Sequence, residues 1–315
     1  MRVCLHATVC ALTTDLGGTR VVEARIGTPN GRWHRVRAKT FVVACGTIEN
    51  TRLLLASGVG NSQVGCCFME HPRDYALTVI PERPELLEQC AFYDAHRAAG
   101  NSFVGGRLAL TEHAVRVLGH PNASLTLLPR LRKGLAPEGL AERLAQRLKS
   151  VLSASPQEGY GWSRVPNPAR FFDGFRVLTN LEQRPHPENR ITLGPKRDAL
   201  GMPRSRLQWR WRSEEQAELS QLRREVVSCI QSSGLGRVEI DSGRPVDPNA
   251  HHHSGTTRMA VDPRDGVVDA DGRVHGVRNL FVAGASVFPT CGFANPTLTV
   301  VALALRLADH LKARG

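Results

Sequence analysis

Three consecutive histidines, His251, His252 and His253, stand directly before the turn Ser254-Gly255-Thr256. Imidazole takes up and releases a proton near neutral pH, so one histidine held beside a tight turn can act as a general base. Three histidines also suggest a metal site. In an extended segment, however, His251 and His253 face one side and His252 the other, so one ion cannot bind all three. We therefore expect no metal site, and an ordinary cluster of surface histidines is the alternative.

Asn295 and Pro296 precede an apolar pattern that predicts a closing helix, with Leu298, Val301, Ala302 and Leu305 on one face. Asn295 is suited to the N-cap of that helix and Pro296 to its first turn. A helix N-terminus carries partial positive charge and can stabilise an anion that forms in a reaction. Asn295 is therefore either a simple cap or a cap that also binds a reacting group.

Gly46 and Gly284 each end a β-type run at a point where the backbone must turn sharply. The run at 40–45 is followed by a helical pattern at 48–57. A strand, a small-residue turn and a helix bring backbone N–H groups toward a bound anion or cofactor. Plain turn chemistry is the alternative, and the sequence contains no GxGxxG motif.

The remaining elements follow from β-rich runs and helical periodicity. Runs at 3–12, 20–26 and 33–43, with Asn30-Gly31 as a hairpin turn, predict an antiparallel meander that leads into a buried strand. Further strands are expected at 75–80, 124–128, 189–193, 205–211 and 279–283. One helix is predicted over 140–152, and another starts at Ser213, where Gln216 completes a capping box.

Composition narrows the possible partners and compartments. The 41 Lys and Arg against 29 Asp and Glu give a net charge of +12, but all except five of these cations are Arg and they are spread along the chain. We therefore expect no nucleic-acid partner. Apolar runs are far shorter than the ~20 residues of a membrane span. Since no signal-peptide core follows the first residues, we expect a cytoplasmic protein with reduced thiols.

Segments in order along the chain resemble the glucose–methanol–choline (GMC) oxidoreductases. The first runs over 41–55 and on to Met69-Glu70-His71-Pro72. The second comprises 182–185, 189–193 and 198–203, and the third comprises 252–259 with 279–298. The resemblance implies an FAD-dependent enzyme that oxidises a small-molecule alcohol, often a sugar or polyol hydroxyl. Oxygen, a quinone and a cytochrome are the alternative electron acceptors.

The resemblance also implies roles for particular residues. His252 matches the family's catalytic base, which takes the hydroxyl proton while hydride passes to flavin N5, and Asn295 matches the second member of that pair. Gly46 matches a turn near the diphosphate–ribose side of the cofactor. The residues that match segments lining the flavin are Gly284, Ala285, Ser286, Asn295, Pro296 and Thr297.

The resemblance predicts an α/β plus α+β fold. An incomplete Rossmann-like FAD-binding domain would comprise residues 1–72 and 243–315, with an antiparallel-sheet substrate-binding domain, 73–242, inserted. Family members begin with a βαβ unit that carries GxGxxG, so this chain resembles their C-terminal part. The alternatives are a truncated, inactive fragment, a chain that binds FAD only beside a partner chain, and a basic binding protein.

Overall fold

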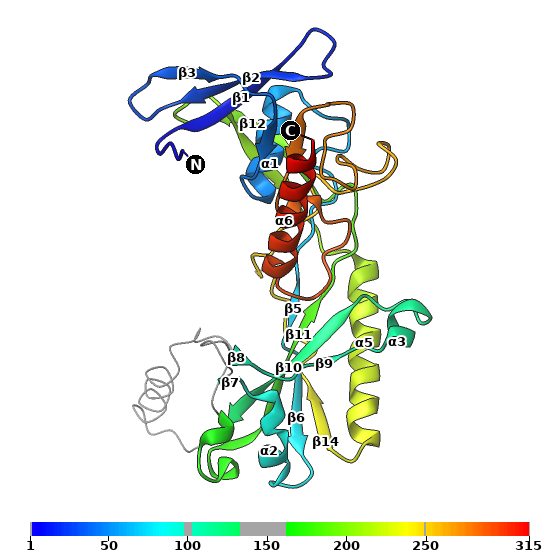
Figure 1. Cartoon of the computed structure of the whole chain (residues 1–315). Coiled ribbons are helices and arrows are strands. Elements are labelled where there is room, and N and C mark those ends of the chain that lie inside the picture. The colour runs from blue at the N-terminus through cyan, green and yellow to red at the C-terminus, as the bar shows by residue number, and fades with distance from the viewer. Residues whose placement is uncertain (1, 98–102, 133–161, 249, 315) are drawn as a thin grey trace. The chain divides into compact units, whose positions relative to one another are not determined.

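The chain forms two compact units (Figure 1). The computed structural model describes residues 2–97, 103–132, 162–248 and 250–314. Unit 1 consists of Met1–His71, Glu182–Trp211 and Ala250–Gly315, and unit 2 consists of Pro72–Leu181 and Arg212–Asn249. Each unit has its own cluster of buried apolar side chains. The helix predicted over 140–152 lies outside the described residues.

Unit 1 begins with the predicted meander, which the structure confirms. Strands β1 (Thr8–Thr14), β2 (Val21–Gly27) and β3 (Trp33–Val36) form an antiparallel sheet in that order. The run predicted over 33–43 divides into β3 and a separate strand, β4 (Phe41–Val43). The division arises because the amide of Phe41 donates to the carbonyl of Asn279, 2.9 Å away, so β4 joins a different sheet.

The partner of β4 is β15 (Leu280–Val282), and the two strands are parallel, with Phe41 opposite Leu280. The predicted helix after Gly46 is confirmed as α1 (Thr47–Ser57), and its Leu53 and Leu54 lie in the core. The chain closes with a short 3₁₀ helix, η5 (Ala285–Val287), and with α6 (Thr297–Ala313). Parallel strands end at the same edge of a sheet, so the turns after β4 and β15 are neighbours.

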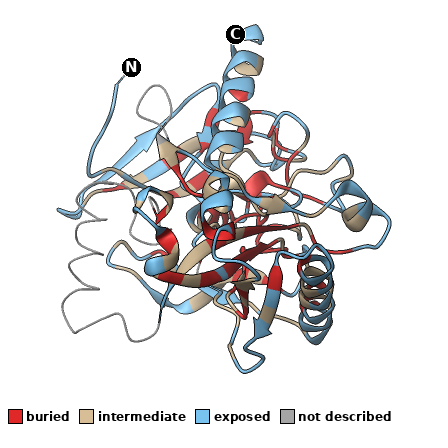
Figure 2. Cartoon of the chain, turned by 90° about the horizontal axis from the view of Figure 1, so that it is seen from below, coloured by how far each residue is buried: buried red, intermediate tan, exposed pale blue. Residues whose placement is uncertain are grey.

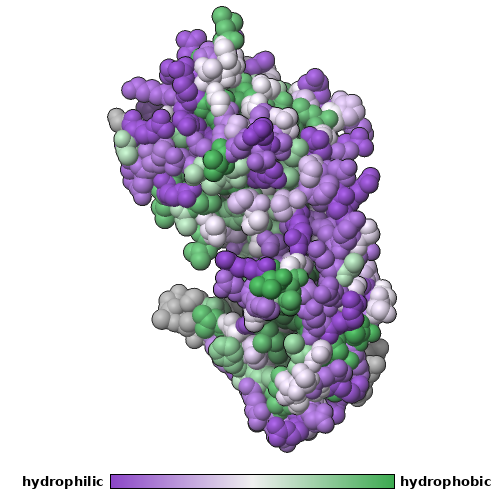
Figure 3. Space-filling model, turned by 90° about the vertical axis from the view of Figure 1, so that its right-hand side faces the viewer, coloured by the Kyte–Doolittle hydropathy of each residue, from purple (hydrophilic) through white to green (hydrophobic). Residues whose placement is uncertain are grey.

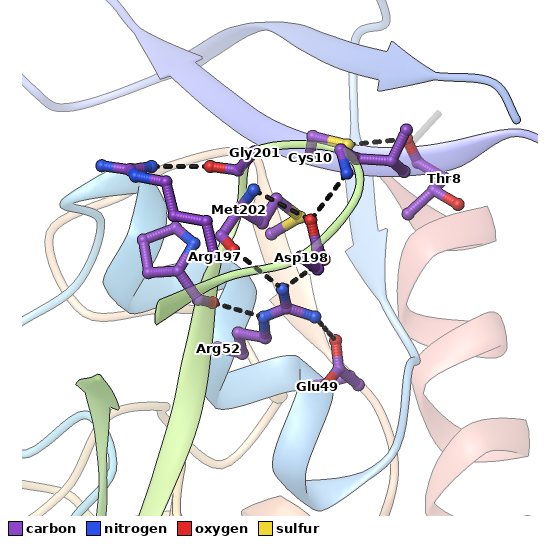
Figure 4. A network of polar contacts seen from close by, with 10 residues as sticks. Thr8, Cys10, Glu49, Arg52, Arg197, Asp198, Gly201 and Met202 are labelled. Carbon is purple, nitrogen blue, oxygen red and sulfur yellow. Dashed lines mark hydrogen bonds and ion pairs between the residues drawn. The ribbon is translucent and has the colours of Figure 1, made fainter. Parts of the chain in front are cut away.

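The hairpin of β12 (Arg190–Arg197) and β13 (Pro203–Gln208) also belongs to unit 1. Arg52 links helix α1 to this hairpin. Its guanidinium donates to Asp198 Oδ2 (2.5 Å) and to the carbonyl of Pro203 (2.7 Å) (Figure 4). This contact explains why the hairpin, which our predicted boundaries put in the middle domain, packs with unit 1.

Unit 2 is built on a six-stranded antiparallel sheet with the order β14-β6-β11-β10-β9, and β5 pairs with β11. Antiparallel strands were predicted for this region at 75–80 and 124–128. The bounds are β5 (Arg73–Asp74), β6 (Leu77–Pro81), β9 (Leu108–Ala109), β10 (Ala123–Leu131), β11 (Phe172–Leu181) and β14 (Gly236–Ile240). Smaller elements are α2 (Leu86–Gln89), η1 (Cys90–Tyr93), β7 (His96–Arg97), β8 (Phe103–Val104), α3 (Glu112–Arg116), η3 (Trp162–Arg164) and η4 (Pro168–Arg170).

Helix α5 (Ser213–Ser232) packs in unit 2 and begins at Ser213 as predicted, but its capping box lies one residue earlier than predicted. The amide of Arg212 donates to Glu215 Oε2 (2.8 Å), so Arg212 and Glu215 form the cap in place of Ser213 and Gln216. A carboxylate is the stronger acceptor for this bond because it is charged. Further along, Arg223 binds the buried carboxylate of Asp74 with two hydrogen bonds, of 2.9 and 2.7 Å.

Buried residues gather in the central strand β11, whereas β3 is exposed throughout and the helices expose their outer faces (Figure 2). On the face that Figure 3 shows, hydrophilic side chains predominate and apolar ones lie in separate patches. Within the described part of the chain, none of the helices combines the length and the apolar character that a membrane crossing requires.

Candidate functional site

A cavity of about 450 Å³ lies in unit 1 beside the ends of β4 and β15. Its lining comes from four places: the turn after β4, the three histidines, the turn after β15 and the first turns of α6. The lining residues are Ala44, Gly46, Thr47, His251, His252, His253, Ala283, Gly284, Ala285, Pro296, Val300 and Ala304. Segments far apart in the sequence thus meet where a parallel strand pair ends, which is the usual ligand position in such sheets.

The two glycine turns leave their backbones open to the cavity. Gly46 has a φ of +82° and Gly284 a φ of +114°, which L side chains rarely adopt. A Cβ at Gly46 would meet no atom within 4 Å, and one at Gly284 would meet only Asn50 Nδ2, at 3.8 Å. A ligand can therefore approach both backbones closely. Gly46 also precedes α1, whose first N–H groups carry partial positive charge.

Backbone hydrogen bonds hold the histidine segment in place. Ser254 pairs with Met69 through two bonds of 3.1 Å, and the amides of Gly255 and Thr257 donate to the carbonyls of Ala285 and Ser286. Gly255 has a φ of +87°, and a Cβ there would lie 2.3 Å from the carbonyl oxygen of Cys67. Only glycine fits at this position, so the Ser-Gly-Thr turn has a definite structural cause.

Each histidine has a different environment. His252 packs edge-on against the buried ring of His71, with 5.1 Å between the ring centroids. His251 and His253 line the same cavity, with ring centroids 6.4 Å apart, and His253 Nε2 is 3.1 Å from Glu70 Oε1. Burial lowers the pKa of His253 below its ordinary value, and His251 lowers it further. Among the described residues, no group of three His, Cys, Asp or Glu side chains is arranged to hold a metal ion.

The predicted site residues do not all reach the cavity. Five of them line it: His252, Gly46, Gly284, Ala285 and Pro296. Ser286 is fully buried behind the turn, where its hydroxyl accepts a hydrogen bond from Asn50 Nδ2 (2.9 Å). Asn295 and Thr297 are exposed and do not line the cavity.

The predicted helix cap at Asn295 is corrected by the structure. The N-cap of α6 is Pro296, whose carbonyl accepts the amide of Val300 at 2.9 Å. Proline can hold this position because its fixed φ is compatible with a helix start. Asn295 therefore lies one residue before the cap, and its side chain is not engaged there.

Sequence reasoning did not identify Asn50, which holds the two glycine turns together. Its side chain accepts from the amide of Cys45 (2.6 Å) and donates to the carbonyl of Ala283 (3.0 Å). Asn50 is completely buried, three and four residues before the core residues Leu53 and Leu54. A polar residue on the apolar face of a helix was the signal that could have revealed it. Glu70 was also missed: its segment, Glu70-His71-Pro72, was interpreted as a turn between domains and as part of the resemblance, without a role at the site.

Comparison with known proteins identifies related sequences. Residues 185–304 match the family model described as GMC oxidoreductase. The fructose dehydrogenase large subunit of Gluconobacter japonicus is 28% identical over 97% of this chain and 53% of its own length. The 6'''-hydroxyparomomycin C oxidase of Streptomyces lividus is 28% identical over 96% of this chain and 50% of its own length. The chain thus spans about half the length of these curated relatives.

Solved structures share the fold at low sequence identity. Pyridoxine 4-oxidase from Mesorbium loti aligns with a TM-score of 0.51 at 17% identity, covering 96% of this chain and 57% of that one. Formate oxidase from Aspergillus oryzae RIB40 aligns with a TM-score of 0.54 at 18% identity, covering 98% and 60%. These alignments support a mixed fold of helices and antiparallel sheets.

Proposed function

Because the chain belongs to the GMC oxidoreductases, we propose that it forms part of an FAD-dependent enzyme that oxidises an alcohol, with a sugar or polyol hydroxyl as its substrate. The observation that carries this proposal is the cavity that collects His252, the two glycine turns and Pro296. The names of the relatives, a fructose dehydrogenase and a hydroxyparomomycin oxidase, support a hydroxyl as the reacting group.

The residues around the cavity fit part of a flavin cofactor. Gly46 and Gly284 leave room where side chains would stand, and the volume of about 450 Å³ is in the range of small-molecule sites. We propose that Gly46, Gly284, Ala285 and Pro296 bind the cofactor. Ser286 would stabilise the turn after β15 through its hydrogen bond with Asn50. When bound, the flavin supplies the hydride acceptor.

In this proposal His252 is the base that takes the proton of the substrate hydroxyl. Its ring borders the cavity, and a neutral imidazole can accept a proton near neutral pH. Asn295 would donate a hydrogen bond to the same oxygen, and Thr297 would lie beside the cofactor. Both residues flank Pro296, which does line the cavity, so this assignment requires their exposed side chains to face the bound ligands.

We further propose that unit 1 is an incomplete Rossmann-like FAD-binding domain and that unit 2 is the substrate-binding domain. The parallel pair β4–β15, followed by the helices α1 and α6, supports the first assignment. The six-stranded antiparallel sheet supports the second.

A variant of the proposal is that FAD binding needs a further polypeptide. The sequence has no GxGxxG, and the relatives are about twice as long as the region they share with this chain. In that variant, a partner chain or segment supplies the glycine-rich βαβ unit that holds the diphosphate.

The experiment is a measurement of FAD stoichiometry on the purified 315-residue chain, with Gly46→Ala and Gly31→Ala as a matched pair. Both glycines have similar positive φ values, +82° and +77°, and open space, but only Gly46 borders the cavity. Each substitution should cost about 1–3 kcal/mol of stability, because an L side chain is strained at these positive φ values, while only Gly46→Ala should weaken FAD binding.

The outcomes separate the two versions. Stoichiometric FAD on the chain alone supports the first version. Binding that appears only with a GxGxxG-containing partner segment supports the second. If FAD binds under neither condition, or equally well to both glycine variants, the proposal is wrong.

A further inference from the structure

Glu70 is a buried carboxylate that lies against the histidine segment, residues 250–253. Only 5% of the residue is exposed, and its Oε1 is 3.1 Å from His253 Nε2. A carboxylate is seldom buried unless neighbouring groups compensate for the loss of water. The groups that compensate for Glu70 therefore indicate what this side chain does.

The compensating groups belong mainly to the histidine segment itself. Burial raises the pKa of Glu70, and the backbone amides of His71, His252 and Ala250, together with the side chain of His251, offset part of that rise. The amide of His71 lies 3.3 Å from Oε2. The amides on both sides of His251, including that of His252, thus lie close enough to the carboxylate to lower its pKa.

The backbone of Glu70 is fixed from the opposite direction. Its amide donates to Gln183 Oε1 (3.2 Å), and its carbonyl accepts from Cys291 Sγ (3.6 Å). Gln183 is fully buried and also accepts from Trp209 Nε1 (2.9 Å). Glu70 therefore stands on a rigid, hydrogen-bonded support, which is what accurate placement of a functional side chain requires.

His253, at the C-terminal end of the histidine segment, is also held by groups other than Glu70. The hydroxyl of Thr47, the first residue of α1, donates to the carbonyl of His253 (2.7 Å). The ring of Phe68 packs on the ring of His253, with centroids 5.3 Å apart. His252 thus lies between anchored neighbours, while its own ring borders the cavity.

We propose that Glu70 is a positioning residue of this site: its carboxylate holds the backbone of His252 and the ring of His253, and so directs the His252 imidazole at the cavity. The inference rests on the proposed function for the role of His252, but the positioning itself does not require a bound cofactor. Oε1 makes no hydrogen bond in the described structure, and in this proposal it accepts the proton that neutral His253 carries on Nε2, 3.1 Å away.

The test uses the cofactor-free chain labelled with ¹⁵N, and compares it with Glu70→Gln and Glu70→Asp. The ¹⁵N spectrum should show His253 as the Nε2–H tautomer, and the amide of His252 should be protected from hydrogen exchange. Because a charged acceptor binds an N–H about twice as strongly as a neutral one, Glu70→Gln should speed exchange of the His252 amide about 10-fold. Glu70→Asp keeps the charge and should restore part of the protection.

Glu225→Gln is the matched control. Glu225 also contacts a buried histidine, His120, with 2.8 Å between Nε2 and Oε2, but this pair lies in unit 2. Its substitution should change the signals of His120 and leave those of His252 and His253 unaltered.

If Glu70→Gln leaves both the tautomer of His253 and the exchange of His252 unchanged, the proposal is overturned. Should Glu70→Gln fail to fold, the same readings on Glu70→Asp decide: altered signals support the proposal and unaltered ones overturn it.

Steady-state kinetics of the FAD-loaded enzyme provide a second test, which connects the positioning of His252 to catalysis. A base displaced by about 1 Å can lose about 100-fold in rate, so Glu70→Gln should lower kcat by this order with KM little changed. If His252→Ala leaves flavin reduction unaltered while Glu70→Gln still loosens the His252 amide, the proposed function fails and the positioning role stands.

Discussion

His252 is presented to the cavity by the hydrogen bonds of its neighbours. Ser254 is paired with Met69, and Gly255 occupies a position where a Cβ would collide with the carbonyl of Cys67. The buried ring of His71 packs against the His252 ring. In the proposed role as base, the His252 ring would keep its direction before the substrate arrives, which is the condition for efficient proton transfer.

The substitution His252→Ala should lower the rate of flavin reduction by the substrate by about 100- to 10,000-fold, because general-base catalysis contributes about that much. FAD content should stay near that of the unaltered protein. Stopped-flow absorbance of the flavin gives the rate. His34→Ala, on the exposed strand β3, is the control and should reduce normally. A rate in His252→Ala equal to that control would show that another group is the base.

Asp198 makes the stability of unit 1 depend on pH. The hydrogen bond from Arg52 lowers the pKa of Asp198, and the amides of Met202 and Leu200 lower it further. Burial raises this pKa, but the hydrogen bonds outweigh that effect. The ionised carboxylate is therefore favoured more in the folded than in the unfolded chain. This contribution is complete above the ordinary carboxyl pKa and is lost as the pH falls through the lowered value.

The variant Asp198→Asn should cost about 1 kcal/mol at neutral pH, a modest figure because the side chain is partly exposed to water. The difference from the unaltered chain should shrink as the pH falls below the ordinary carboxyl pKa. Urea unfolding at several pH values measures both effects. Parallel curves for the two proteins over the whole range would contradict the assignment of Asp198.

Helix α6 shows how an element can differ from the expectation of its apolar pattern. The face of Leu298, Val301, Ala302 and Leu305 is exposed, with Leu298 at 82% and Leu305 at 64%. The contacts with the core come from Val300 and Leu303, and Leu307 is only 8% exposed. A small cavity of about 20 Å³ already lies beside Leu307, next to Val282 and Val287.

Two leucines of α6 form a matched pair for stability. Leu307→Ala should destabilise unit 1 by about 2–4 kcal/mol, because it enlarges a cavity next to the core. Leu305→Ala, on the exposed face, should change stability by less than about 0.5 kcal/mol. Urea unfolding of both variants measures the difference. Similar losses for the two would mean that the face of Leu305 is covered in solution.

At the scale of the whole molecule, the described chain has two separate apolar cores. Val43, Leu54 and Val282 belong to the core of unit 1, whereas Phe175 and Val177 belong to that of unit 2. The chain passes from one unit to the other several times. Units with their own cores can open independently, so a cavity in one core acts first on its own hydrogen bonds.

Hydrogen exchange measured by mass spectrometry can test this independence with Val177→Ala. Val177 is completely buried in unit 2, and its truncation should cost about 2 kcal/mol. Exchange should speed up in β10 and β11, while β4 and β15 in unit 1 keep their protection. Equal acceleration in both sets of strands would show that the two units unfold as one.

Local patterns in the sequence predicted the longer elements of unit 1 and helix α5, but not the strands β11 and β14 of unit 2. The turn at Asn30-Gly31, the apolar periodicity before Gly58 and that before Gly234 each depend on neighbours a few residues away. For the same reason the meander, α1 and α5 could be located within a few residues. The capping residues were predicted less exactly, since Arg212 and Pro296 are the N-caps where Ser213 and Asn295 were expected.

The sequence by itself determined the strands and helices of unit 1 and the residue types that make its chemistry possible. Only the tertiary structure decided which of those residues meet. Asn50 and Ser286 are 236 positions apart, Glu70 lies against a histidine segment from the other end of the chain, and β4 pairs with β15. Joining segments that are far apart in the sequence costs conformational entropy, and burial of apolar surface throughout unit 1 offsets that cost. Such contacts therefore depend on the whole core and cannot be predicted from any local pattern.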